Sequence, residues 1–493
     1  MSGAVENRDG FMPPPAGEFL GHPKALWNLF ASEFWERFMY YGMRAMLAVH
    51  IAAAFFAHLG DGARAEASLT YGGFTSLVYM TGIAGGFVAD RILGYQRSIM
   101  LGGALMAVGS FMLMAPDLTT FVIGLAVIVV GNGLFKPNIS TMVGKLYAPG
   151  DVRRDSGFTI FYMGINAGAF FAPFICASWI GQTYGYRWGF FSAGIGMILG
   201  LMVFQLLKGW LGHVGTAPEG KKGFAPVIQV LLAAAVMVIP VYYLLSKSDI
   251  LGVLLIGMML ALVAYFVYSG VRSGDKVQLH RYIAMLILFV ANILFWALFE
   301  QAGSSLTFLA QDFVKMPDVS ILGWTPTFEV FQSVNPVFII LLAPVFATLW
   351  IKLDKAEWNP SIPRKFAYGM AGAALGFYVL VFAIQNFVDA GGKISWVWLA
   401  LTYLIHTMGE LCLSPIGLAM VTKLAMPKET GLAMGGWFLS IAMANFVAGR
   451  IAAIASGGNA EGESASSLLQ YASTFNQLFI LGIVIAVLFF LAA

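Results

Sequence analysis

Seven ionisable side chains lie within stretches of the chain that are otherwise apolar. Four are carboxylic acids and three are bases: Glu33, Glu36, Glu300, Glu410, Arg37, Arg44 and Lys136. A charge at the centre of a membrane-spanning helix costs about 2.5–3.5 kcal/mol on insertion scales, so seven unpaired charges would cost about 20 kcal/mol. We therefore expect these groups to pair with one another around a water-filled cavity. A purely structural lattice of ion pairs is the alternative.

The densest part of this set lies between residues 32 and 44. At about 100° per residue, a single helix face with an arc of about 100° carries Glu33, Glu36, Arg37, Tyr40 and Arg44. The opposite face is apolar and carries Phe34 and Phe38. Because the charged face cannot lie against lipid, we expect it to line a cavity. An interfacial helix with solvated charges is the alternative.

The charge count suggests a use for this cavity. Four acids against three bases leave one carboxylate without a basic partner, and such a carboxylate in a low-dielectric site favours its protonated form. Uptake of one proton would make the set neutral, which is a way to build a proton-coupled carrier. Arg450 changes the count if it also faces the cavity.

Neutral polar side chains in apolar stretches are further candidates for the cavity: Tyr79, Asn166, Asn292, Gln301, Asn335 and Ser414. Asn166 and Asn335 can each donate and accept hydrogen bonds. A single Asn within a membrane helix also commonly joins two helices, and this alternative stays open for each one. Trp296 and Trp437 fit either a cavity wall or core packing.

The composition restricts the class of protein that carries these groups. The 493 residues are 59% hydrophobic and 11% charged, whereas soluble proteins have about 25% charged residues. An aromatic content of 14% excludes disorder, two cysteines exclude a disulfide scaffold, and a net charge of +3 gives no reason to expect nucleic-acid binding. Neither a P-loop nor a metal-binding spacing of His and Cys occurs, so we expect no cofactor, no metal and no enzyme activity.

The apolar stretches predict an all-α membrane protein with 14 transmembrane helices. We place them near residues 25–57, 69–90, 98–115, 119–146, 157–179, 185–208, 224–245, 250–271, 280–310, 328–351, 365–387, 394–424, 431–455 and 467–492. With both termini in the cytoplasm, cytoplasmic segments hold 19 of the 28 Lys and Arg residues and outer segments hold five. We expect three units: a six-helix bundle at 25–208, an inserted two-helix hairpin at 224–271, and a second six-helix bundle at 280–492.

Two motifs resemble known families. Gly85-Gly86-Phe87-Val88-Ala89-Asp90-Arg91, continuing to Gly94 and Arg97, resembles the cytoplasmic loop signature of the major facilitator superfamily, with one extra residue before the later Gly. The run Glu33-x-x-Glu36-Arg37-Phe38-x-Tyr40-Tyr41 is more specific and resembles the first-helix signature of the proton-dependent oligopeptide transporter family. Segments 133–138, 161–169, 295–301 and 409–415 are similar to later signatures of that family. The likeness runs from residue 25 to about 445, and 14 helices match the family's bacterial form.

The resemblance implies roles for the candidate residues. Arg37 and Lys136 would hold the carboxylate of a peptide, and Glu410 with Asn166 and Asn335 would hold its ammonium group. Tyr40, Tyr41 and Tyr79 would line the pocket, and Trp296 and Trp437 would wall the side-chain subsites. Glu33, Glu36 and Glu300 would take part in proton coupling, while Arg44 with Glu300 and Lys136 with Glu410 would pair in alternation as two gates open and close.

One position departs from the family pattern. Some relatives have a histidine seven residues before the tyrosine that matches Tyr79, and here that position is Gly72. A coupling scheme based on that histidine does not apply, so carboxylates must suffice.

We therefore predict a monomeric, proton-coupled symporter that imports di- and tripeptides across a bacterial plasma membrane by alternating access. Two alternatives remain: a carrier of another small anion or zwitterion, such as nitrate, an amino acid or a drug, and a membrane protein that binds its ligand without proton-dependent flux.

Overall fold

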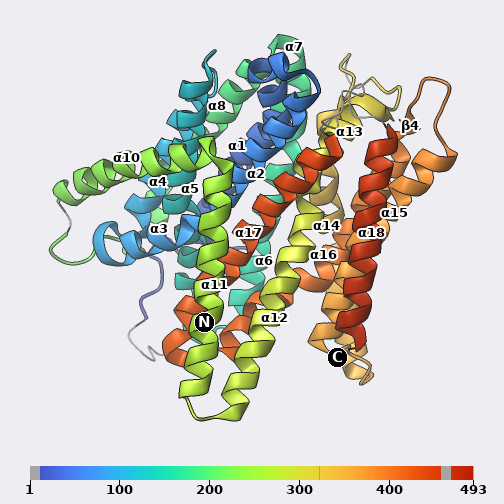
Figure 1. The fold of residues 1–493 in the computed structure, drawn as a ribbon. Helices are drawn as coiled ribbons and strands as arrows, with labels where there is room; N and C mark the ends of the chain where they lie inside the picture. The colour runs from blue at the N-terminus through green and yellow to red at the C-terminus, as the bar shows by residue number, and fades with distance from the viewer. Residues whose placement is uncertain (1–10, 222, 321–322, 457–467, 492–493) are drawn as a thin grey trace.

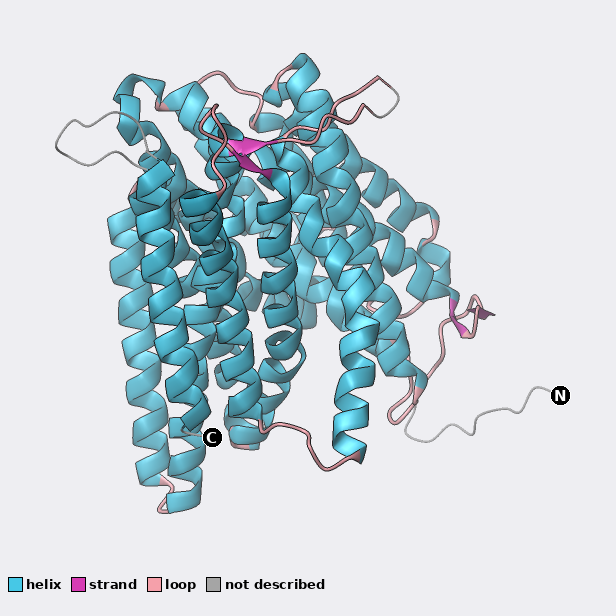
Figure 2. Ribbon diagram, turned by 90° about the vertical axis from the view of Figure 1, so that its right-hand side faces the viewer, coloured by secondary structure: helices cyan, strands magenta, loops and turns pink. Residues whose placement is uncertain are grey.

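The computed structural model describes residues 11–221, 223–320, 323–456 and 468–491, without the side chains of residues 61, 83, 414–416, 418 and 419. The described chain is almost entirely helical, with two short strand pairs (Figure 2). Thirteen helical segments in this part of the chain are long and apolar enough to cross a membrane. Helix α4 (Tyr95–Met112) takes the place of the predicted span 98–115 but is not among them, and it begins with the polar residues Gln96 and Arg97. The predicted class, an all-α membrane protein, is confirmed.

Residues 24–211 form what we call the N half. Its elements are α1 (Lys24–Phe55), η1 (Ala57–Gly62), α2 (Ala63–Met80), α3 (Gly82–Val88), η2 (Ala89–Leu93), α4, α5 (Leu118–Lys145), α6 (Arg153–Ala172), η3 (Pro173–Gly181), α7 (Gln182–Tyr184), α8 (Tyr186–Leu206) and α9 (Lys208–Leu211). Helix α1 packs against α6 and α8, and α4 packs against α5 and α8. The charged first helix is therefore surrounded by other helices, as its composition requires.

Residues 276–491 form the C half. Its helices are α12 (Lys276–Phe299), η4 (Glu300–Gly303), α13 (Ser305–Phe313), η5 (Phe328–Ser333), α14 (Val334–Lys355), α15 (Ile362–Asn386), α16 (Trp396–Leu424), η6 (Pro427–Glu429), α17 (Thr430–Ser456) and α18 (Leu468–Leu491). Helix α15 packs against α16 and α18, and α12 packs against α17.

Two further helices connect the halves. Helix α10 (Ala225–Ser246) lies against α5 and α2 of the N half, whereas α11 (Ser248–Arg272) lies against α12 and α17 of the C half. Figure 1 shows α10 extending obliquely to the left and α11 standing upright in front. An ion pair between Asp249 of α11 and Arg450 of α17 fixes α11 to the C half. The division of the chain into two bundles and an inserted hairpin stays a prediction.

Local sequence explains several helix ends. The side chain of Asp117 accepts a hydrogen bond from the backbone N–H of Thr120 at 2.8 Å and so caps α5. Gly94 and Gly185, with φ of 75° and 97°, make the turns that start α4 and α8. Strands β1 (Glu18–Phe19) and β2 (His22–Pro23) pair antiparallel before α1. Strands β3 (Val314–Lys315) and β4 (Ile394–Ser395) pair in parallel and join the end of α13 to the start of α16.

The two halves pack most closely where α2 crosses α17. A Cβ atom at Gly72 would lie 2.7 Å from the Cα atom of Gly449, closer than a real Cβ can approach. No side chain fits at position 72 without moving a backbone. The close crossing of α2 and α17 therefore requires glycine at position 72.

Candidate functional site

The basic side of the charged cluster lies between α1 and α5. Glu33 and Glu36 are fully buried. The guanidinium of Arg37 forms an ion pair with Glu36 and reaches Glu33 at 3.5 Å, and the ammonium of Lys136 forms an ion pair with Glu33. Both bases are therefore neutralised by carboxylates of α1.

Asn132 completes this arrangement from α5. Its amide Nδ2 donates to Glu36 Oε1 at 3.2 Å. Asn132 stands four residues before Lys136, so both side chains lie on the same face of α5 and both meet the acids of α1. Sequence analysis did not select Asn132, although its spacing from Lys136 was a usable signal.

Arg44 connects the two halves. Its guanidinium forms an ion pair with Glu300 of η4 and donates to the hydroxyl of Tyr71 on α2. Tyr71 was also missed, because a tyrosine in an apolar run has the same pattern as a core residue. The predicted pairing of Arg44 with Glu300 is thus present, whereas Lys136 contacts Glu33 rather than Glu410.

Glu410 of α16 is held by neutral groups. The amide of Asn335 donates to Glu410 Oε2 at 2.9 Å and to Thr407 Oγ1 at 3.0 Å. Glu410 is 7% exposed, and in the described part of the chain it has no ion pair. Arg450 pairs with Asp249 outside the cluster. The three bases of the cluster pair with Glu33, Glu36 and Glu300, so among the described residues Glu410 is the carboxylate without a basic partner.

Tyrosines fill the space between the two sides. The guanidinium of Arg37 lies 5.0 Å from the ring centre of Tyr40 and 5.8 Å from that of Tyr41, within cation–π range. Tyr79 lies within electrostatic reach of Glu300, Tyr40 and Tyr41. Tyr162, which sequence analysis did not select, lies within reach of Glu410 and Tyr41 and is 40% exposed.

Other predicted residues have structural contacts. The amide nitrogen of Asn166 donates to the carbonyl oxygen of Tyr162 in its own helix at 2.9 Å. Asn292 donates to Ser440 Oγ at 2.8 Å and joins α12 to α17, and Gln301 donates to the carbonyl oxygen of Ala448 at 3.1 Å. For these two side chains, the alternative of helix–helix bonding holds.

The two tryptophans differ in exposure. Trp437 is buried, with its ring centre 6.3 Å from that of Phe289, so it packs in the core of the C half. Trp296 is partly exposed beside Phe295 and Phe299. The side chain of Ser414 lies outside the described part of the structure.

Polar contacts between the halves gather at one end, which carries α7 and α13 and lies at the top of Figure 1. We call it the closed end. There, Arg64 of α2 forms an ion pair with Asp312 of α13, Ser178 of η3 donates to or accepts from Thr327, and Ser333 donates to the carbonyl oxygen of Phe170 at 2.7 Å.

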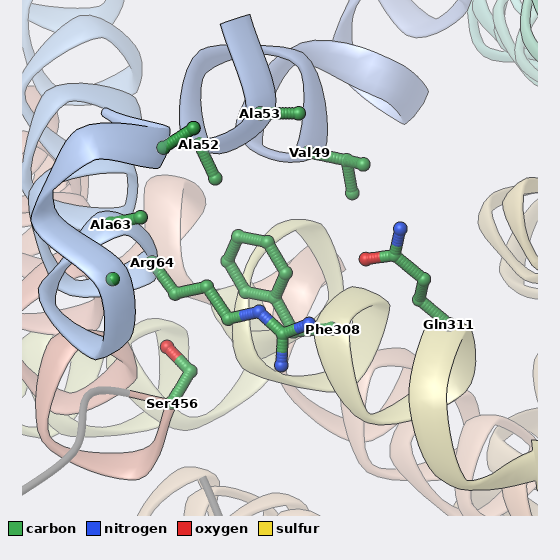
Figure 3. A pocket seen from close by; sticks show the side chains of 10 residues that line it. Val49, Ala52, Ala53, Ala63, Arg64, Phe308, Gln311 and Ser456 are labelled. Atoms are coloured by element: carbon green, nitrogen blue, oxygen red, sulfur yellow. The ribbon is translucent and has the colours of Figure 1, made fainter. Parts of the chain in front are cut away.

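A pocket of about 290 Å³ also lies at the closed end, between α1, α2, α13 and α17. Figure 3 shows the side chain of Arg64 extending across the ring of Phe308, with Gln311 and Ser456 nearby. The guanidinium lies 5.2 Å from that ring centre. Because Asp312 neutralises Arg64, this pocket has no free positive charge and is separate from the charged cluster.

A helical membrane fold built from two halves is typical of a membrane transporter of the major facilitator type. The chain matches the model of the POT family over residues 96–468, and it therefore belongs to the POT family. It is a transporter and not an enzyme.

Individual relatives cover nearly the whole chain. The protein named "Peptide transporter YePEPT" of Yersinia enterocolitica is 38% identical over 467 residues, which are 89% of this chain and 89% of the relative. "Dipeptide and tripeptide permease B" of Edwardsiella piscicida is 34% identical over 438 residues, 88% of this chain and 87% of the relative. A crystal structure of peptide transporter POT in complex with sulfate has a TM-score of 0.80 and 36% identity, and covers 97% of this chain and 96% of that chain.

Proposed function

We propose that the protein is a proton-coupled symporter that imports di- and tripeptides by alternating access. The observation that carries this proposal is the unequal pairing of the cluster: Arg37 and Lys136 are bonded to carboxylates, whereas Glu410 has only neutral partners among the described residues. A peptide zwitterion supplies the ammonium that Glu410 lacks. The names of the relatives, a peptide transporter and a dipeptide and tripeptide permease, support this choice of substrate.

Proton binding prepares the basic side for the substrate. While Glu33 and Glu36 are ionised, they occupy Arg37 and Lys136. Protonation of one of these acids frees a cation for the carboxylate of the peptide. Arg37, Lys136, Tyr40, Tyr41 and Tyr79 then hold this end of the substrate.

The C half binds the opposite end of the peptide. Glu410 and Asn335 accept the ammonium group together with Asn166 of the N half, and the partly exposed Trp296 lies nearer the side chains of the peptide. Protonation of Glu300 would release Arg44 and so loosen the contact between the halves at the closed end. Lys136 and Glu410 would pair when the opposite end closes.

The excess of basic residues in the predicted cytoplasmic segments supports an orientation with both termini inside a bacterial plasma membrane. In this orientation the closed end is the external gate, and we infer that the cluster opens toward the cytoplasm. The carrier would act as a monomer in the lipid bilayer.

The test is uptake of labelled dialanine into liposomes that contain the purified protein, with an inside-negative potential and an inward proton gradient. One proton that moves through 100 mV contributes about 2.3 kcal/mol, enough for roughly 50-fold accumulation. We expect a protonophore to abolish accumulation. Accumulation that persists with the protonophore contradicts proton coupling, and absence of uptake by correctly oriented protein contradicts peptide as the substrate.

A further inference from the structure

One buried carboxyl at the external gate has no part in the coupling described above. Glu329 of η5 is fully buried, and its side chain meets the N half. Tyr186 of α8 donates to Glu329 Oε1 at 2.6 Å, and the amide of Gln182 of α7 donates to the same oxygen. Gln182 also donates to the hydroxyl of Tyr186 at 2.9 Å. These three side chains bridge the halves where the gate closes.

The second carboxyl oxygen of Glu329 is buried and has no hydrogen-bond partner among the described residues. No ion pair to Glu329 is present among them either. An ionised carboxylate buried in this way costs far more than a neutral carboxyl group. Because Oε1 accepts both hydrogen bonds, a proton bound by Glu329 would lie on Oε2.

None of the titratable groups around η5 forms an ion pair with Glu329 among the described residues; Arg187, next to Tyr186 on α8, lies within electrostatic reach of His50. Arg44 pairs with Glu300, and Arg64 pairs with Asp312. The ring centre of His50 lies 6.2 Å from that of Tyr186, and that of Tyr403 lies 6.3 Å from that of Phe331. The charged residues of α6 and α14 lie at the ends of those helices that are remote from η5.

We propose that Glu329 is a proton-binding site that takes up a proton when the external gate closes and returns it to the same side when the gate opens. Since the gate is closed while the cluster is open to the cytoplasm, this proton reaches only the external solution. It makes gate closure depend on external pH and adds nothing to the charge moved with each peptide. The inference rests on the alternating access and orientation of the proposed function.

The opening of the gate can be measured without substrate, as a distance between spin labels. Leu59 of η1 in the N half and Ala390 before β4 in the C half are exposed at this end, and both would be replaced by cysteine. The native Cys176 and Cys412 are buried. The labelled full-length protein in lipid nanodiscs would be measured between pH 5 and pH 8, without peptide.

Release of a proton from Glu329 should raise the open population as pH rises, and this effect is the difference between the parent and Glu329→Gln, because protonation of Glu300 acts in the opposite direction in both proteins. A single proton changes the closed-to-open ratio by about tenfold per pH unit over its titration range, and Glu329→Gln should remove this factor and favour the closed gate. Glu66→Gln, on an exposed carboxylate of α2 at the same end, is the matched control and should leave the profile unchanged. A Glu329→Gln profile that coincides with the parent's, or a gate open at every pH, overturns the proposal.

Tyr186→Phe gives an independent variant that keeps the carboxyl. Loss of one donor weakens the ionised form more than the neutral form, so the pH profile should move to higher pH while the gate still closes in acid. If the gate of Tyr186→Phe instead opens to the same extent at every pH, the closed gate of the parent depends on an ionised Glu329. This result contradicts the proposal.

A flux measurement separates this inference from the proposed function. Glu329→Gln should change the dependence of dialanine uptake on external pH but not the reversal potential, which reports the charge moved per peptide. A changed reversal potential would make Glu329 a transported-proton site and overturn the inference. The label distances need no peptide, so absence of transport would contradict the proposed function and leave the gate measurement valid.

Discussion

The two halves of the molecule hold their buried charges in different ways. In the N half, Arg37 and Lys136 are each bonded to a carboxylate of α1. In the C half, Glu410 accepts a hydrogen bond only from the neutral amide of Asn335 among the described residues. The basic side must therefore break an ion pair before it binds an anion, whereas the acidic side can accept a cation at once. Glu300 of the C half shares one feature with each side. It forms an ion pair, as the acids of the N half do, but its partner Arg44 belongs to the opposite half.

The largest effect is expected from Glu300→Gln, which removes one ionic contact between the halves and the proposed proton site. Proton-driven peptide uptake should be abolished, while counterflow, the exchange of labelled for unlabelled peptide without a gradient, should continue. Both are measured in the same liposomes, with Glu66→Gln as the control. Driven uptake at the parent rate would exclude Glu300 from coupling.

Glu410→Gln tests the acidic side directly. It leaves the ammonium of a bound peptide without a counter-charge, which costs about 3 kcal/mol or more, or roughly 100-fold in affinity. Competition with labelled dialanine would measure the affinities of dialanine and of its N-acetylated form. The loss should be confined to dialanine, and an equal loss for both peptides would contradict a contact between Glu410 and the ammonium.

Lys136→Ala tests the basic side, where Arg37 remains and the lysine side chain is 33% exposed. We expect a loss of about 10- to 100-fold for peptides with a free carboxylate, because a charge-assisted hydrogen bond disappears. C-terminally amidated peptides should lose less. Lys145→Ala, at the end of the same helix, is the matched control. An equal loss for free and amidated peptides would make Lys136 a purely structural residue.

The sequence predicted the contacts that depend on local spacing. Glu33, Glu36 and Arg37 lie three or four positions apart or adjacent on one helix, so a helical period is enough to bring them together. Their partners on other helices needed the fold. Asn132 was missed although it stands four residues before Lys136, whereas Tyr71 was missed because nothing in its apolar surroundings separates a cavity residue from a packing residue.

Asparagine illustrates the same limit within one residue type. Asn292 and Asn335 both stand alone in apolar helices, yet Asn292 joins α12 to α17 and Asn335 meets Glu410. The difference lies in what each side chain faces, which depends on the crossing of helices distant in sequence. Glu329 was missed for a related reason, since an acid at the start of a predicted span has the pattern of a solvated helix end.

The smallest effect is expected where the halves touch, at Gly72. The two sides of the cluster face each other only while α2 and α17 cross closely, and a methyl group at position 72 would meet the Cα of Gly449 at 2.7 Å. Gly72→Ala should destabilise the protein by about 1–3 kcal/mol through overpacking and lower its thermal unfolding temperature in detergent. Gly73→Ala is the matched control, since its methyl group would lie 3.6 Å from the nearest atom of Leu251, an ordinary contact. If both variants unfold at the same temperature, the crossing yields easily and does not fix the distance between the two sides.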